Sequence, residues 1–288
     1  MLRCDAIIWE DGEIDEKDRP VILLGMKGIL SVELVSKGPS RDAHSMLAVL
    51  IENPAWQLVK ALNTMRDNNG KIMIKNWYKE VRAFTDEELT AIENQPFDGE
   101  EYKKEYGITK FVNNVDGIEA KKALVGEPTC NIFGLISGYT GEGAKTVLPS
   151  NAIARLDFRL VPEMNPEALF ERLKDHIREK GFSDLIDINL LGKQPPARTS
   201  ISHPFVKLVV ESAKETYGTA IISISCAGTG PMFYFHKILA APCVCMGASY
   251  KFCREHSPNE FMRIDILNKT TKCIGNIIEK FAGTSNSS

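Results

Sequence analysis

The chain has 288 residues, of which 43% are hydrophobic and 25% charged, and its net charge is -3 at pH 7. This composition is typical of a globular protein with one large domain or two ordinary ones. The net charge lacks the basic excess that is typical of proteins that bind nucleic acid or an anionic membrane surface. No apolar run approaches the ~18 residues of a membrane-spanning helix. The N-terminal residues lack a secretory pattern, and the seven cysteines have no framework spacing, so we expect a reducing, cytoplasmic compartment.

The first 66 residues predict three strands followed by a helix. Short apolar runs at 6–9 and 21–25 are strand candidates, and residues 29–35 alternate apolar with polar side chains as a half-buried strand does. Asn53 and Pro54 then predict a helix start. Asn is a good N-cap, and Pro at the first helical position lacks only a backbone N–H that would have no partner within the helix. The apolar positions expected on its buried face are Leu58, Val59, Leu62 and Met65.

A long insertion follows, from residue 67 to residue 128. Within it Thr85-Asp86-Glu87-Glu88 resembles a capping box, which marks a helix start. The acidic stretch that continues to Tyr106 predicts further short helices. Segments of this length inside a compact unit are usually functional or lid-like.

The next segment completes a recognisable order of elements. Residues 152–160 alternate strongly, residues 131–137 and 185–191 are weaker strand candidates, and a second helix opens at Asn165 and stops at Gly181. Strand, helix, strand, strand, helix, strand is the ferredoxin-like order, in which helices cover one sheet face. The free face is expected to carry Arg155, Asp157 and Arg159.

Residues 1–26 and 195–288 look like pieces of an α/β layer. Their expected strands and helices include 221–225, 242–246, 204–217 and 264–281. These pieces are too few to bury both faces of a sheet. The predicted fold class is therefore α/β, with a partial α/β domain interrupted by a ferredoxin-like (βαββαβ) unit at 27–194.

Three residues are candidates for metal or acid–base chemistry. His256 follows a strand and a loop, and neutral imidazole is the commonest nitrogen ligand of zinc; an exposed loop histidine without a role is the alternative. Asp11 follows a short strand, where a carboxylate points at the ligand crevice of an α/β sheet, although a surface turn fits the local residues better. His44 lies between a strand and a helix cap, and its local sequence by itself does not indicate a function.

A second group of candidates suits substrate binding. Gly228, Thr229 and Gly230 form a loop whose backbone N–H groups can closely approach an anion or a carbonyl oxygen, although a plain turn has the same letters. Arg159 is a fork-shaped donor suited to a carboxylate, and a salt bridge with Asp157 is the alternative.

A competing metal site must also be considered. Cys243, Cys245, Cys253 and His256 have a spacing that resembles a closed zinc site. The first two lie on an expected strand with Val244 between them, so both point to one face. We favour a buried, cysteine-rich strand, because free cysteine behaves as a small hydrophobe.

Six motifs in this order resemble the zinc aminoacylase, carnosinase and succinyl-diaminopimelate desuccinylase family, which includes acetylornithine deacetylases and glutamate-releasing carboxypeptidases. The resemblance runs from Cys4 to Phe281. The motifs are Arg41-Asp42-Ala43-His44-Ser45, Asn53-Pro54-Ala55, Thr146-Val147-Leu148-Pro149, Phe158-Arg159-Leu160-Val161-Pro162, Gly228-Thr229-Gly230-Pro231 and His256-Ser257-Pro258-Asn259-Glu260.

The resemblance implies a role for each candidate. Asp11 matches a ligand of one of two zinc ions, for which cobalt or manganese can substitute, and His256 matches a ligand of the other. His44 matches a lid histidine that reaches the partner subunit's active site and polarises the scissile carbonyl. Arg159 matches the lid arginine that holds a substrate carboxylate. The matching substrate-pocket loop comprises Gly228, Thr229 and Gly230.

The resemblance also implies an overall organisation. The unit at 27–194 corresponds to a lid and homodimerisation domain, and residues 1–26 with 195–288 correspond to the C-terminal part of a zinc-peptidase-like catalytic domain. The family's first metal histidine, bridging aspartate, general-base glutamate and adjacent glutamate ligand lie upstream of the matching residues. Ser225 and Met46 replace an arginine and a glycine of many members, which bears on substrate preference.

We therefore expect a metal-dependent hydrolase of amide bonds in small peptides or N-acyl amino acids. It would be a dipeptidase, a carboxypeptidase or a deacylase, and this chain, as its C-terminal portion, would be inactive alone. The alternative is a non-catalytic dimerisation or binding module, or half of a split enzyme that docks with a separate N-terminal half.

Overall fold

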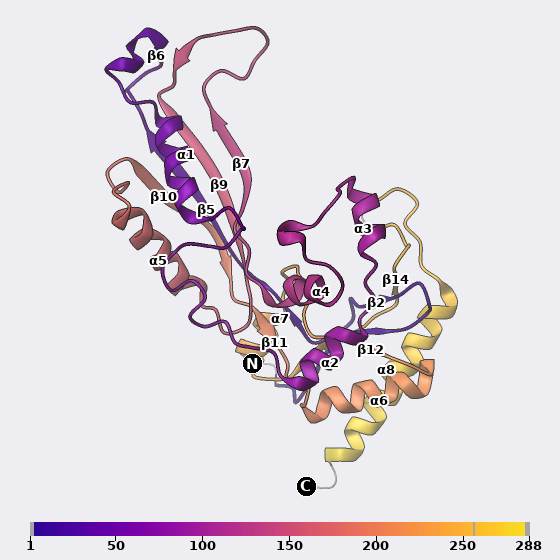
Figure 1. Ribbon diagram of the computed structural model, residues 1–288. Helices are drawn as coiled ribbons and strands as arrows, with labels where there is room; N and C mark the ends of the chain where they lie inside the picture. The colour runs from indigo at the N-terminus through magenta and orange to yellow at the C-terminus, as the bar shows by residue number, and fades with distance from the viewer. Residues whose placement is uncertain (1–2, 256, 286–288) are drawn as a thin grey trace.

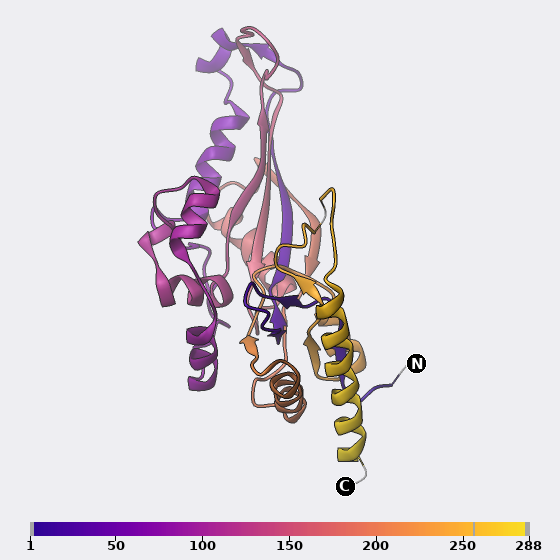
Figure 2. The same cartoon turned by 90° about the vertical axis from the view of Figure 1, so that its right-hand side faces the viewer.

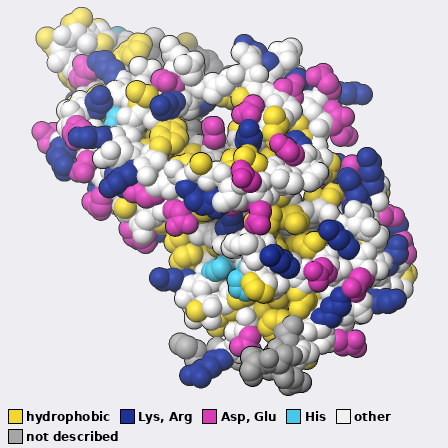
Figure 3. Space-filling model, turned by 60° about the horizontal axis from the view of Figure 1, so that its bottom comes forward, with side chains coloured by type: hydrophobic (Ala, Val, Ile, Leu, Met, Phe, Trp, Pro, Cys, Tyr) yellow, Lys and Arg dark blue, Asp and Glu magenta, His cyan; other side chains and the backbone are white. Residues whose placement is uncertain are grey.

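The computed structural model describes residues 3–255 and 257–285. A long antiparallel sheet rises from a smaller α/β layer, and Figure 2 shows the long sheet nearly edge-on. On the face shown in Figure 3, charges of both signs are mixed with apolar side chains, in keeping with the small net charge. None of the described helices is long and apolar enough to cross a membrane.

The long sheet has four strands in the order β10-β5-β9-β7. They are β5 (Gly28–Lys37), β7 (Asn131–Ser137), β9 (Asn151–Leu160) and β10 (Ile186–Gln194). Every second residue of β5 and β9 is buried, because alternate side chains point to opposite faces of a strand. The expected order of elements, strand, helix, strand, strand, helix, strand, is confirmed.

Two helices cover one face of this sheet (Figure 1). They are α1 (Pro54–Met65) and α5 (Pro166–Glu179), capped by the side chains of Asn53 and Asn165 as expected. The prediction that Val59 is buried is wrong, since it is 46% exposed. Ala61 occupies the buried face instead, because a helix turns about 100° per residue and Val59 falls beside the contact stripe.

The smaller sheet has the order β1-β13-β3-β12. Its strands are β1 (Ile7–Trp9), β3 (Val21–Leu23), β12 (Ile221–Ser223) and β13 (Cys243–Cys245). Helices α6 (Pro204–Tyr217) and α8 (Ile264–Ser285) pack on one face of it, where they bury an apolar cluster that includes Ile22, Val206 and Ile277. Helix α7 (Met232–Leu239) packs against β13 and against β11 (Ala197–Arg198) in a separate apolar cluster.

The insertion contains three α-helices, α2 (Asp86–Asn94), α3 (Gly99–Tyr106) and α4 (Gly117–Gly126), and the turn η2 (Val112–Asn114). The capping box at Thr85 and Glu88 is confirmed. Helices α2 and α4 pack on the smaller layer rather than on the long sheet: Ile92 of α2 and Val125 of α4 share a buried cluster with Ile224. The insertion thus returns from the long sheet to the layer at its base (Figure 1).

Short paired strands complete the fold. The pairs are β2 (Glu13–Ile14) with β14 (Ser249–Tyr250), β6 (Ala43–His44) with β8 (Val147–Leu148), and β4 (Gly25–Met26) with β11 (Ala197–Arg198). The last pair forms the junction through which the chain enters and leaves the long sheet. A further short element, the turn η1 (Ser45–Val49), follows β6. The division into domains at 27–194 and at 1–26 with 195–288 stays a prediction.

Candidate functional site

The predicted substrate-binding loop lies at this junction. We call residues 226–230 the substrate loop. The N–H of Cys226 donates to the carbonyl of Gly25 at 2.8 Å, and the N–H of Lys27 donates to the carbonyl of Cys226 at 3.2 Å. These bonds fix the loop against β4, where β5 begins and β9 ends.

The structure brings together two of the residues expected to bind substrate. The guanidinium Nη1 of Arg159 donates to the hydroxyl of Thr229 at 2.8 Å across 70 positions of sequence. The salt bridge considered as an alternative is also present, because Nε of Arg159 lies 3.5 Å from a carboxylate oxygen of Asp157. Arg159 therefore points at the substrate loop from the open face of the sheet.

The glycines of the loop are in tight surroundings. The N–H of Gly228 donates to the sulfur of Cys226 at 3.2 Å, and the carbonyl of Gly230 accepts from the side-chain amide of Gln194. A Cβ at Gly230 would lie 2.6 Å from the sulfur of Met26. A larger residue at Gly230 would therefore require the flexible end of the Met26 side chain to shift.

Asp11 lies in an adjoining cavity of about 660 Å³. The same cavity is lined by Glu13, Glu255 and the beginning of the substrate loop at Cys226. Burial raises the pKa of Glu13, partly opposed by the charge of Lys251. The cavity therefore connects the candidate metal ligand with the candidate substrate loop.

The other candidate metal ligand, His256, lies outside the described residues. Within residues 3–255 and 257–285 no group of three His, Cys, Asp or Glu side chains is placed to hold a metal ion. Asp11 by itself is too small a donor set for zinc, which takes at least three protein ligands in a catalytic site. The described residues therefore do not assemble a metal centre.

His44 lies far from this site. It caps the turn η1, its Nδ1 accepts the N–H of Met46 at 3.2 Å, and its side chain is exposed. It follows the Lys37 end of β5, whereas Arg159 pairs with Ile29 near the other end (Figure 1). Eight residues of strand span about 25 Å, so His44 does not reach the Arg159 site of its own chain.

The cysteines of the competing zinc site do not converge in the described residues. Cys243 and Cys245 point into an apolar cluster with Met232, and burial raises the pKa of both thiols to about 12. Cys253 instead contacts the hydroxyl of Ser249 at 3.5 Å. Since zinc binds the thiolate, the first two are better explained as core residues, as favoured from the sequence.

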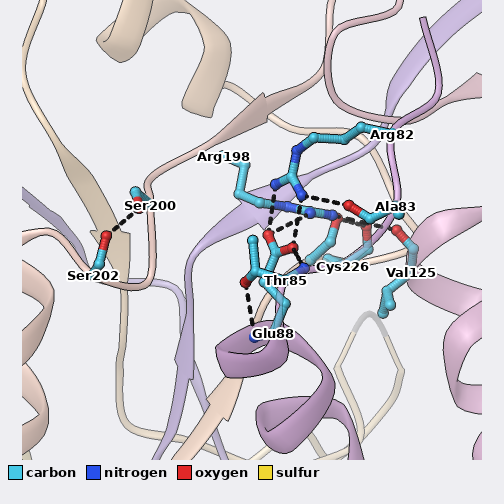
Figure 4. Close-up of polar contacts among 10 residues, drawn as sticks. Arg82, Ala83, Thr85, Glu88, Val125, Arg198, Ser200, Ser202 and Cys226 are labelled. Atoms are coloured by element: carbon cyan, nitrogen blue, oxygen red, sulfur yellow. Dashed lines mark hydrogen bonds and ion pairs between the residues drawn. The ribbon is translucent and has the colours of Figure 1, made fainter.

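A charged cluster at the junction was not predicted from the sequence. Figure 4 shows the guanidinium groups of Arg82 and Arg198 turned toward the carboxylate of Glu88. Arg82 binds this carboxylate at 2.7 and 2.8 Å and Arg198 binds it at 3.1 Å. Burial alone would raise the pKa of Glu88, but hydrogen bonds from Arg82 and Thr85 and the charge of Arg198 lower it to about 2. The capping box was the one sequence signal for this carboxylate.

Lys27 was missed as well. It is 3% exposed, and its ammonium donates to the backbone carbonyl of Glu127 at 2.6 Å. Burial lowers its pKa to about 8. A lysine between Met26 and Gly28 gives no sequence pattern that distinguishes it from an exposed lysine.

A four-stranded antiparallel sheet with two helices on one face, joined to a smaller α/β layer, is the arrangement to be compared with known proteins. Residues 24–184 match the model of the M20 peptidase dimerisation domain. Since this match covers more than half of the chain, the protein belongs to the M20 peptidase family.

Known relatives agree with this assignment. The chain is 30% identical over 197 residues to the Cys-Gly metallodipeptidase dug1 of Schizosaccharomyces pombe, covering 66% of this chain and 40% of that protein. It is 26% identical over 201 residues to the Beta-Ala-His dipeptidase of Rattus norvegicus, with the same shares covered. The chain thus spans about 40% of the length of these relatives.

A solved structure resembles the fold over nearly the whole chain. It is the M20 family metallo-carboxypeptidase Sso-CP2 from Sulfolobus solfataricus, with a TM-score of 0.86 and 38% sequence identity. The match covers 96% of this chain and 63% of that one. Both the long sheet and the smaller layer are therefore common to the two proteins.

Proposed function

We propose that this chain is the C-terminal portion of a metal-dependent peptidase that cleaves the amide bond of a dipeptide or another small substrate with a free carboxylate. The supporting observation is the contact between Thr229, in a loop of small residues, and the guanidinium of Arg159, a group whose geometry suits a carboxylate. The names of the relatives, two dipeptidases and a metallo-carboxypeptidase, support the same substrate class.

Each residue has a defined task in this proposal. Arg159 binds the substrate carboxylate through its planar fork of donors. Thr229 orients that fork, and the backbone of Gly228 and Gly230 leaves room for the substrate's amide. Together with further ligands, Asp11 and His256 would hold zinc, and the metal would supply Lewis-acid polarisation of a carbonyl and an activated water. His44 acts in the site of a partner subunit.

The proposal predicts that the chain alone has no activity. The test is to assay purified chain with Cys-Gly and β-Ala-His, with and without zinc, and then after co-expression with the N-terminal portion of the Sulfolobus relative. We expect turnover only in the combined sample. Turnover by the isolated chain that is lost in His256→Ala would contradict the proposed incompleteness.

Arg159 can be tested in the same combined sample. Arg159→Met should raise KM for a dipeptide by roughly 10–100-fold, because a charge-assisted bond to a carboxylate is lost. Arg155→Met is the matched control, since Arg155 lies on the same face of β9 and binds Glu33 instead. Equal KM values for the two variants would refute the role of Arg159.

We further propose that the protein forms a homodimer through the outer edge of the long sheet. Strand β7 is an edge strand, and its Leu135 and Ile136 are 56% and 58% exposed. Trp56 of α1, the helix packed on β5 and β9, is 64% exposed. An unpaired edge with exposed apolar side chains favours pairing with another chain.

Sedimentation velocity tests this interface. Ile136→Lys should convert the dimer to a monomer, because it places a charge in the apolar contact. Leu191→Lys, on the opposite edge strand β10, is the control and should remain dimeric. A wild-type chain that is monomeric at all concentrations would contradict the proposal, whereas a dimer without turnover in the combined sample would favour a non-catalytic binding module.

A further inference from the structure

Lys27 is a buried cation placed directly beneath the candidate site. It connects β4 to β5, so it lies at the point where the chain enters the long sheet. The backbone N–H of Lys27 donates a hydrogen bond to the carbonyl of Cys226, the first residue of the substrate loop. Lys27 therefore supports the loop that contacts Arg159.

Its charge is compensated only in part. The described hydrogen bond of its ammonium goes to the neutral backbone carbonyl of Glu127, whose own side chain is exposed to water. Among the neighbouring charges, Glu127 favours the ammonium most and Cys226 of the substrate loop favours it too, whereas Arg159 of β9 and Arg198 of β11 oppose it. Desolvation by burial is the largest influence on it.

The neighbouring cations differ in how well they are paired. Arg198 is neutralised by the buried carboxylate of Glu88. Arg159 donates to the neutral hydroxyl of Thr229 at 2.8 Å, and its contact to Asp157 is longer, at 3.5 Å. Lys27 and Arg159 therefore place two cations beside the substrate loop, with partial compensation from Glu127 for the first and from Asp157 for the second.

We propose that Lys27 is a positioning residue of the anion site at Arg159, stabilising a bound carboxylate from beneath the substrate loop without touching it. This inference rests on the proposed function of Arg159 as the carboxylate-binding group. It adds a second cation that selects anionic over neutral ligands.

The inference has a pH signature. The pKa of Lys27 is lowered to about 8 by burial. An anion bound nearby favours the charged ammonium, so it raises this pKa, and by linkage the anion binds most tightly below pH 8. If the rise is about one unit, the affinity falls about tenfold as the pH increases through both pKa values.

The first experiment measures Lys27 in the wild-type chain. N-acetylglycine, which has one carboxylate and one amide, is the probe. NMR of labelled lysine side chains gives the pKa of Lys27 with and without saturating probe, and Lys27→Arg identifies its signal. We expect the probe to raise the pKa of Lys27, while the exposed Lys37 at the far end of β5 keeps its own value.

Calorimetry on variants gives a second readout. Lys27→Met should bind the probe roughly tenfold more weakly at neutral pH and lose the pH dependence, whereas Lys27→Arg should keep the affinity and lose the pH dependence. Lys37→Met is the control and should match wild type. A merely structural role of Lys27 would not change the pH profile.

Two failures are distinguishable. If N-acetylglycine binds wild type and Arg159→Met equally, or binds neither, the role proposed for Arg159 is overturned and the inference falls with it. If binding requires Arg159 but the pKa of Lys27 does not move, the inference on Lys27 alone is overturned.

Discussion

Removing the charge of Glu88 should destabilise the junction between the long sheet and the smaller layer. The carboxylate is 5% exposed and binds both Arg82 and Arg198. Its pKa lies at about 2 against an ordinary value of 4.5. Since each unit corresponds to about 1.4 kcal/mol, the ionised carboxylate contributes about 3 kcal/mol to the free energy of unfolding. Screening reduces this little, because water barely reaches the group.

Glu88→Gln keeps the size of the side chain and removes its charge. It also leaves Arg198, whose side chain is 8% exposed, without its counter-ion. Breaking a buried pair from one side typically costs about 3–5 kcal/mol, which agrees with the value from the pKa. Urea unfolding followed by circular dichroism should therefore show a loss of about 3 kcal/mol. Glu87→Gln, the exposed neighbour on α2, is the control and should lie within ~0.5 kcal/mol of wild type.

The effect has a defined pH dependence. A lowered pKa in the folded state means that the stabilisation is complete above about pH 4.5 and is lost as the pH falls toward about 2. The difference between wild type and Glu88→Gln should shrink over that interval. Equal stability of Glu88→Gln and Glu87→Gln near neutral pH would refute the reasoning, because the pair would then contribute no net stability.

Three further substitutions test packing and capping by the same urea assay. Gly12→Ala should lose about 1–3 kcal/mol, since its Cβ would lie 2.3 Å from the facing backbone, whereas Gly192→Ala has open space and should cost less. Phe158→Ala should lose about 3–5 kcal/mol from the core of the long sheet, while the half-exposed Phe133→Ala should change little. Thr85→Ala should cost about 1 kcal/mol, because it removes the side chain that caps α2; an unchanged midpoint would contradict the cap's contribution.

The sequence by itself determined the elements of the long sheet. Alternation in β5 and β9 predicts their buried faces, because a strand repeats every two residues, and Asn53 and Asn165 mark the starts of α1 and α5 by local capping. The motifs also predict substrate binding for Arg159 and, separately, for the loop at Thr229, and the two side chains are in contact at 2.8 Å. These features depend on local periodicity or on short motifs.

The tertiary structure alone decided where distant segments meet. It placed α2 and α4 on the smaller layer, joined Glu88 to Arg198 across 110 positions, and buried Lys27 against the carbonyl of Glu127. It also moved Val59 out of the core in favour of Ala61. None of these has a local signal, because burial and charge pairing depend on which elements pack together, and the local periodicity of one segment does not specify its neighbour.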